Sequence, residues 1–123
     1  MALILVIDDD EDMRVVTQEI LESAGFEVVL ASDGAQGLKL YRERPADLVI
    51  TDILMPEKEG IETIFDLKQE FPKVKIIAVS GDSSSLKTPD YLSAASKLGA
   101  DVVLRKPFES SVLLEAIGKV LKQ

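Results

Sequence analysis

The fold is decided by the stretch Leu3-Ile4-Leu5-Val6-Ile7-Asp8-Asp9-Asp10 near the start of the chain. Its uninterrupted apolar run is typical of a strand that is buried on both faces, as strands are in a parallel sheet. The acids that follow cannot continue such a strand, so we expect it to end at Ile7. They therefore stand at its carboxyl end, the end at which open α/β sheets bind ligands.

The rest of the chain alternates apolar runs with helical periods. After the first strand, further strands are predicted at 27–30, 48–50, 74–79 and 102–104. The helices between them are predicted from apolar spacing, from Gly25, Gly60 and Gly99, and from the prolines, and their apolar positions include Met13, Val16, Ile20, Leu21, Ile61, Ile64, Phe65, Val112, Leu113, Ile117 and Val120. A loop is expected at 81–85, followed by a helix from Thr88 to about Leu98. This alternation predicts an α/β fold, doubly wound, with helices covering both faces of a parallel sheet.

Composition narrows the classes of function. A chain of 123 residues is typical of one domain, so we expect residues 1–123 to form a single domain. The absence of cysteine and histidine excludes disulfides, thiolate metal sites, serine hydrolase triads and the usual zinc sites. The net charge of −8 disfavours direct binding to nucleic acid or to an anionic membrane. The apolar run 3–7 is too short to span a membrane and is followed by acids, unlike a signal peptide, so we expect a cytoplasmic protein.

Polar residues at the predicted strand ends form a candidate site. Asp8 and Asp9 follow the first strand, Asp52 follows the third, Ser80 the fourth and Lys106 the fifth. Three carboxylates within ~4 Å of one another would repel by roughly 4 kcal/mol per pair at an effective dielectric constant near 20, so a cation is required. Mg²⁺ fits best, because it takes oxygen ligands and is usually held by one or two carboxylates plus a phosphate.

A metal ion, an ammonium group and a hydroxyl around one carboxylate suit phosphoryl transfer. Such groups neutralise the charge that the oxygens of the transferred phosphoryl group carry in the transition state. Lys106 would supply the ammonium and Ser80 the hydroxyl. Asp52 would then be the nucleophile, and the product would be an aspartyl phosphate.

Four stretches together resemble the receiver domain of response regulators, the phosphoacceptor module of two-component signalling. They are 5–10 (LVIDDD), 47–56 (DLVITDILMP) leading to Gly60, 76–80 (IIAVS) and 106–108 (KPF). The resemblance covers essentially the whole chain. It implies a (βα)5 domain whose five parallel strands lie in the flavodoxin-like order 2-1-3-4-5.

The resemblance also implies metal ligands. Asp52 matches the phosphorylated aspartate, and Asp8 and Asp9 match the acid pair that holds Mg²⁺. The main-chain carbonyl of Leu54 stands where the family offers a further metal ligand. The expected cofactor is therefore Mg²⁺, held by Asp8, Asp9, Asp52 and Leu54.

The two remaining matches concern the phosphoryl group. Ser80 matches the Ser or Thr whose hydroxyl turns toward that group, and Lys106 matches the lysine that pairs with it. The peptide bond before Pro107 matches one that is cis in the family. Two departures stand beside these matches: Val103 occupies a place that is commonly aromatic, for which Tyr91 is a weak substitute, and the segment 83–87 looks longer than usual.

The implied partners follow from this role. The phosphodonor would be a histidine kinase or a histidine phosphotransfer protein, and the recipient of the signal a downstream output protein or domain. Phosphorylation would switch the surface of the fourth helix, fifth strand and fifth helix. We expect no direct contact with nucleic acid or membrane, and no turnover beyond self-phosphorylation from a donor and autodephosphorylation. A phosphorylation-dependent dimer stays an open alternative.

Two other functions remain open from the residues. Asp8-x-Asp10 resembles the start of the nucleophile motif of haloacid-dehalogenase-type phosphatases. Asp12, however, occupies the position at which that motif has Thr or Val. A pseudo-receiver that keeps the fold and acts as a scaffold without phosphorylation is the second alternative, and the intact acids and Lys106 disfavour it.

Some of these acids also have simpler structural interpretations. Asp8 with Glu11 resembles a capping box, and Asp10 on its own suits a helix cap. Three further acids are most simply turn or cap residues: Asp33, Asp47 and Asp101.

Overall fold

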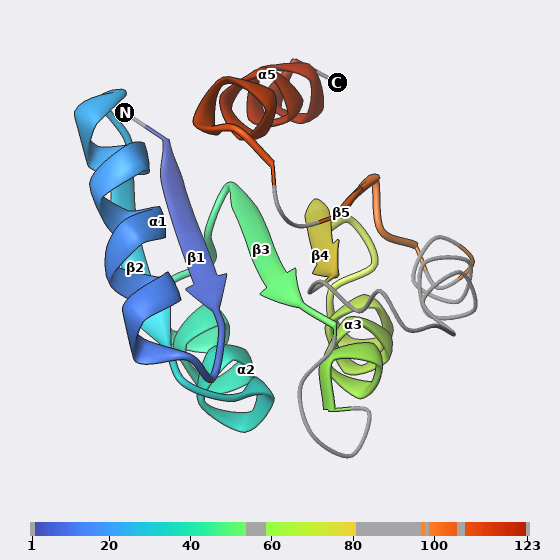
Figure 1. Cartoon of the computed structure of the whole chain (residues 1–123). Coiled ribbons are helices and arrows are strands. Elements are labelled where there is room, and N and C mark those ends of the chain that lie inside the picture. The colour runs from blue at the N-terminus through green and yellow to red at the C-terminus, as the bar shows by residue number, and fades with distance from the viewer. Residues whose placement is uncertain (1, 54–58, 81–96, 98, 106–107, 123) are drawn as a thin grey trace.

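The computed structural model describes residues 2–53, 59–80, 97, 99–105 and 108–122. Within them, one sheet is made of β1 (Leu3–Ile7), β2 (Glu27–Ala31), β3 (Leu48–Asp52), β4 (Ile76–Ser80) and β5 (Val102–Arg105) (Figure 1). The helices are α1 (Glu11–Ser23), α2 (Gly34–Glu43), α3 (Glu59–Glu70) and α5 (Ser110–Leu121). The strands are all parallel, in the order β2-β1-β3-β4-β5, which confirms the predicted fold class.

The sheet separates two layers of buried side chains, because successive residues of a strand point to opposite faces. In β1, Leu3, Leu5 and Ile7 pack with α2 and α3. Ile4 and Val6 pack on the other face with α1 and α5. All five are nearly inaccessible to solvent, as expected of a strand covered on both sides.

The first two helices begin at aspartate caps. The carboxylate of Asp10 accepts hydrogen bonds from the main-chain N–H groups of Asp12 (3.0 Å) and Met13 (3.3 Å). Asp33 caps α2 in the same way, accepting from Gln36 (2.8 Å). Asp10 is thus the helix cap, as its sequence position suits, and the alternative interpretation of Asp8 with Glu11 as a capping box does not hold, because the Asp8 carboxylate accepts from the N–H of Asp10.

Two other aspartates tie strands together at their amino ends. Asp47 immediately precedes β3, and its carboxylate accepts from the main-chain N–H of Leu3 in β1 (2.7 Å). Asp101 immediately precedes β5, and its carboxylate accepts from the N–H of Ile76 in β4 (2.9 Å). Each therefore satisfies the first N–H group of the neighbouring strand, as a cap does for a helix.

Some predicted boundaries differ from the structure. Val74 is buried but precedes β4, because its N–H donates to the carbonyl of Phe71 in the turn that follows α3. Gly60 lies within α3, which begins at Glu59, and β2, β3 and β5 extend one or two residues past their predicted ends. The loop 81–85 and the helix predicted from Thr88 lie outside the described residues, apart from Lys97.

Three of the apolar residues whose spacing predicts the helices are exposed. Val16, Phe65 and Val112 are 41% to 47% accessible. Each lies at the side of a helix whose contact with the sheet is already filled by other residues, among them Leu21 in α1 and Leu113 in α5. The apolar spacing marked the helices correctly, but these three apolar positions lie outside the faces that the helices bury.

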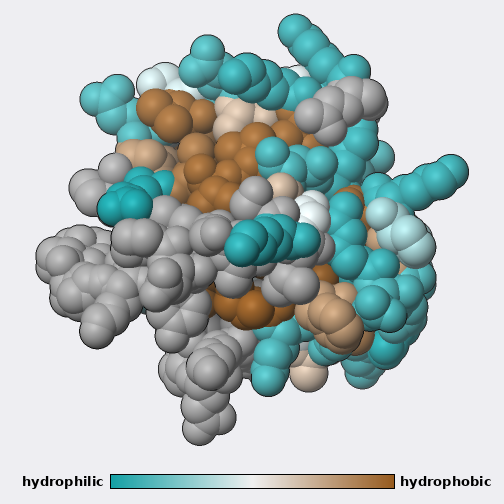
Figure 2. All heavy atoms as spheres, turned by 90° about the vertical axis from the view of Figure 1, so that its right-hand side faces the viewer, coloured by the Kyte–Doolittle hydropathy of each residue, from teal (hydrophilic) through white to brown (hydrophobic). Residues whose placement is uncertain are grey.

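β5 forms one edge of the sheet, and its apolar residues 102–104 are half-buried. Figure 2 views the molecule from the side on which β5 lies and shows apolar side chains gathered in the upper part of this face, bordered by hydrophilic ones.

Among the described residues, none of the helices combines the length and apolar character that crossing a membrane requires.

α2 and α3 pack closely against each other on one face of the sheet. Gly34, the first residue of α2, lies against the buried side chain of Thr63 in α3. Toward the other end, the rings of Tyr41 and Phe71 have centroids 4.6 Å apart. The contact of Gly34 with Thr63 places the start of α2 beside the first half of α3.

We predict that Gly34→Ala destabilises the protein by about 1–3 kcal/mol, because the added methyl group would overlap the Thr63 hydroxyl. Gly118→Ala is the matched control. Among the described residues, no heavy atom outside its chain neighbours and its own helix backbone lies within 4 Å of the place its Cβ would take, so it should stabilise α5 by about 0.5–1 kcal/mol. Urea denaturation of both variants measures this, and a Gly34→Ala variant as stable as the wild type would contradict the close approach.

We also predict a pH-dependent coupling between α2 and α3. The Arg42 guanidinium donates two hydrogen bonds to the Glu70 carboxylate (2.5 and 2.8 Å), which lowers the pKa of Glu70 and raises that of Arg42. A carboxyl group with a lowered pKa stabilises the fold above its unfolded pKa and loses that effect as pH falls through the folded value. A double-mutant cycle of Arg42→Ala and Glu70→Ala should show a small favourable coupling near pH 7 and a weaker one at about pH 3. Equal coupling at both pH values would contradict it.

Candidate functional site

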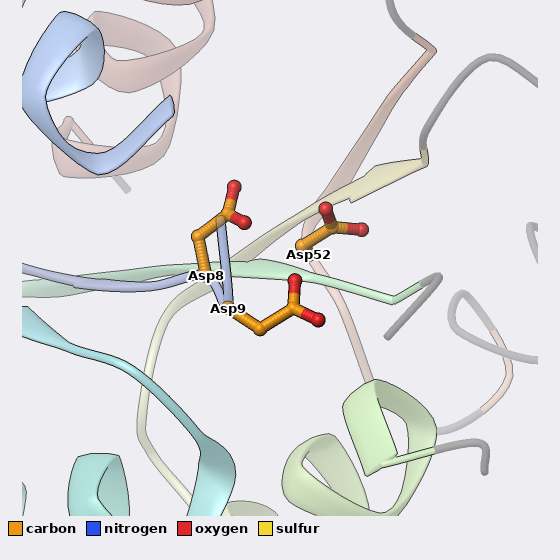
Figure 3. A group of neighbouring side chains, drawn as sticks. All are labelled: Asp8, Asp9 and Asp52. Carbon is orange, nitrogen blue, oxygen red and sulfur yellow. The ribbon is translucent and has the colours of Figure 1, made fainter. Parts of the chain in front are cut away.

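Three carboxylates meet at the carboxyl end of the sheet. The register of β1 and β3 pairs Ile7 with Thr51, so Asp8 and Asp52 are the next residues of two adjacent strands. One carboxylate oxygen from each of Asp8, Asp9 and Asp52 lies within 4.8 Å of the other two. Figure 3 shows the three side chains converging on the space beyond the strand ends.

The three acids differ in exposure. Asp8 and Asp52 are only 6% and 8% exposed, whereas Asp9 is open to solvent. Asp8 and Asp52 border a narrow hollow that α1 and α5 also line, with Met13, Phe108 and Leu113 among its apolar residues. The acids therefore combine a buried pair with one solvent-facing member, which leaves an approach from outside.

Three hydrogen bonds hold the turn between β1 and α1 in place. The N–H of Asp8 donates to the carbonyl of Ala31 (3.1 Å), which continues the pairing of β1 with β2 by one residue. The carboxylate of Asp8 accepts from the N–H of Asp10 (2.9 Å). The main-chain carbonyl of Asp8 accepts from the Arg14 guanidinium (2.7 Å). The turn is thus tied to β2 and α1 on either side of the acids.

The electrostatics of this group favour a bound divalent cation. Carboxylates so close together repel one another, and the buried pair is poorly screened by solvent. Their oxygens are the ligand type that Mg²⁺ prefers. Opposite ligands of six-coordinate Mg²⁺ are about 4.2 Å apart when each lies about 2.1 Å from the ion, so oxygens within 4.8 Å of one another are near the separation that one ion requires. The donor set is therefore suited to Mg²⁺.

The other predicted site residues are placed less completely. Ser80 is the last residue of β4, one position beyond the pair formed by Asp52 and Val79, so its backbone lies at the same edge of the sheet. Ser80 in turn pairs with Arg105, the last residue of β5. Leu54 and Lys106, like Tyr91 and Pro107, lie outside the described residues, so their predicted roles stay predictions.

Sequence reasoning did not single out Arg14. It is the first basic residue of the chain and follows an unbroken run of five acids at 8–12, with one residue between. A cation four residues after Asp10, and so one helical turn into the helix, is a signal that could have been noticed, because a residue at that position can reach back to the helix start.

The comparisons with known proteins agree with this geometry. The family model described as "Response regulator receiver domain" matches residues 4–118. The chain is 40% identical to the chemotaxis protein CheY of Bacillus subtilis over 119 residues, 96% of each chain. It is 36% identical to the transcriptional regulatory protein CpxR of Escherichia coli over 98% of this chain and 49% of CpxR.

Solved structures give the same result. The CheY-like receiver domain protein of Methanospirillum hungatei is similar with a TM-score of 0.89 and 32% identity, over 99% of this chain and 94% of that one. The match spans the sheet, its helices and all three converging carboxylates. The chain therefore belongs to the family of response regulator receiver domains.

Proposed function

We propose that Asp52 is the residue that accepts the phosphoryl group in this receiver domain. The observation that carries the proposal is the convergence of its carboxylate with those of Asp8 and Asp9. Receiver domains are phosphoaccepting signalling modules of two-component systems, and Asp52 is the buried acid at the end of a central strand. We propose that Lys106 and Ser80 contact the transferred group.

The proposed reaction is a transfer from phosphohistidine. An Asp52 carboxylate oxygen attacks phosphorus, the new P–O bond replaces the P–N bond, and the leaving imidazole nitrogen keeps the electron pair. A carboxylate oxygen, unlike a hydroxyl, has no proton to lose when it attacks, so the step calls for no general base. The role of the chain is then to position that oxygen and to offset the charge on the phosphoryl group.

Receiver domains typically bind Mg²⁺ through an acidic pocket. We propose that Asp8, Asp9, Asp52 and the main-chain carbonyl of Leu54 hold it in this chain. When bound, Mg²⁺ offsets negative charge on both the acids and the phosphoryl oxygens. The exposed position of Asp9 supports this assignment, since an ion that exchanges with solvent needs an accessible ligand.

We propose that phosphorylation switches the surface of the fourth helix, β5 and α5. Moving a population from about 10% to 90% active requires about 2.6 kcal/mol, which one or two charge-assisted hydrogen bonds can supply. Val103 is half-buried against the side-chain layer of α2 and α3. A valine has no ring to rotate, so switching in this chain would use backbone movement at the end of β4 in place of an aromatic flip.

Receiver domains work with histidine kinases and output domains. We propose that the donor here is a histidine kinase or a histidine phosphotransfer protein, and that residues 1–123 act as one domain on a downstream output protein or domain. We place the reaction in the cytoplasm, because the phosphoryl group originates from ATP. Neither the haloacid-dehalogenase alternative nor the pseudo-receiver alternative is favoured by the family match.

Incubation with Mg²⁺ and acetyl phosphate should add one acid-stable, base-labile phosphoryl group, and Asp52→Asn should prevent it. The amide has the size of the carboxylate and lacks its nucleophilic oxygen. Intact-mass spectrometry gives the number of groups added. Asp66→Asn, the same change at an exposed position in α3, should label like the wild type.

Persistent labelling of the Asp52→Asn variant would assign the phosphoryl group to another residue. A wild-type protein that takes no label would favour the pseudo-receiver alternative. Continuous release of phosphate from small phosphate esters would favour the phosphatase.

We predict that Asp9→Ala weakens Mg²⁺ binding and at the same time stabilises the metal-free protein. The variant loses a metal ligand, and it also loses one of three mutually repelling charges. The gain should be roughly 1 kcal/mol, because Asp9 is exposed and its repulsion is screened. Calorimetric titration with Mg²⁺ and urea denaturation in chelator measure the two effects.

Asp12→Ala is the matched control for Asp9→Ala. Asp12 is also exposed, but it lies in the first turn of α1, where a negative charge favours the helix. The control should leave Mg²⁺ affinity within about twofold and should not stabilise the metal-free protein. A destabilised Asp9→Ala variant would count against the repulsion between the acids.

A further inference from the structure

Arg14 reaches from α1 back to the acids at the end of β1. Its guanidinium donates to the main-chain carbonyl of Asp8 (2.7 Å), while its own N–H donates to the carbonyl of Asp10 (3.0 Å) in the helix. The side chain is half-buried. It is therefore a partly desolvated charge bonded to the turn that carries two of the three converging carboxylates.

The bonded carbonyl belongs to the peptide group that joins Asp8 to Asp9. A peptide group is planar, so fixing its oxygen also fixes the orientation of its N–H and of the Asp9 Cα. The Asp8 side chain is held separately by the N–H of Asp10. The bond from Arg14 thus acts on the orientation of Asp9, the exposed member of the group.

We propose that Arg14 is a positioning residue for the divalent cation site: it orients the Asp8–Asp9 peptide so that both carboxylates face the same ion. This inference rests on the proposed function, because it concerns the Mg²⁺ that Asp8, Asp9 and Asp52 would hold. The bond uses a main-chain oxygen, so it takes none of the carboxylate oxygens that the ion needs.

Three roles of Arg14 predict different changes in Mg²⁺ affinity. As a positioning residue, its removal weakens binding, since partners that orient metal ligands typically contribute tenfold or more to affinity. As a nearby positive charge alone, its removal strengthens binding, because it repels the cation. As a packing residue alone, its removal lowers stability and leaves affinity unchanged. The sign of the change separates the three.

Arg14→Met tests the proposal, since methionine keeps an unbranched apolar side chain and removes the donor and the charge. We expect Mg²⁺ binding about tenfold weaker by calorimetry. The amide nitrogen resonance of Asp9 should also shift, because it shares the peptide group whose carbonyl loses a hydrogen bond. Arg14→Lys, which keeps a charged donor, should recover most of the affinity. Unchanged or tighter binding by Arg14→Met overturns the proposal.

Two further measurements keep the outcomes distinct. Lys119→Met, the same loss of charge at an exposed position in the last turn of α5, should bind Mg²⁺ like the wild type. If Arg14→Met does not fold, Arg14→Gln replaces it with the same expectation, since its side chain is too short to make the same bond. A wild-type protein that binds no Mg²⁺ and accepts no phosphoryl group overturns the proposed function itself. Wild-type binding and labelling with unchanged affinity in the Arg14 variants overturns only this inference.

Discussion

The pairing register of β1 with β3 is the constraint on which the site depends. Because Ile7 lies opposite Thr51, the next residue of each strand is an aspartate, and the two carboxylates end up side by side. A shift by one residue would move one strand's side chains into the opposite apolar layer, where they meet other packing partners, and would separate the acids. The packing of the strands into the two apolar side-chain layers is therefore also what aligns the two aspartates, since the same register satisfies both.

Aspartate serves opposite purposes at the two ends of the sheet. At the amino end, Asp47 and Asp101 each accept a hydrogen bond from the neighbouring strand and so stabilise the fold. At the carboxyl end, Asp8 and Asp52 are gathered where their charges repel. Such repulsion is a cost to folding that only a cation or a partner group offsets, which is typical of functional sites. The same side chain is structural or functional according to what its carboxylate faces.

The sequence predicted the sheet more fully than the edges of the site. The strands and their order could be predicted because buried apolar runs carry a strong pattern and because the chain resembles receiver domains. Asp8, Asp9 and Asp52 could be predicted as neighbours because the carboxyl ends of parallel strands meet at one edge. The contact of Arg14 with the Asp8 carbonyl could not, since it depends on how a long side chain folds back from a helix whose angle to the sheet is set by packing. The exposure of Val16 and Phe65 could not be predicted either, because spacing does not tell how much of a helix surface its neighbours cover.

The sheet backbone keeps the two layers of apolar side chains apart, one with α2 and α3 and the other with α1 and α5. Each layer is packed independently of the other. The strands connect the two layers, because alternate residues along a strand belong to different layers. Volume lost on one side cannot be filled from the other. Homologues can consequently diverge in the residues of one layer while the other layer stays unchanged. A chimera that exchanges a pair of helices together with the strand residues facing them would inherit one complete layer from each parent.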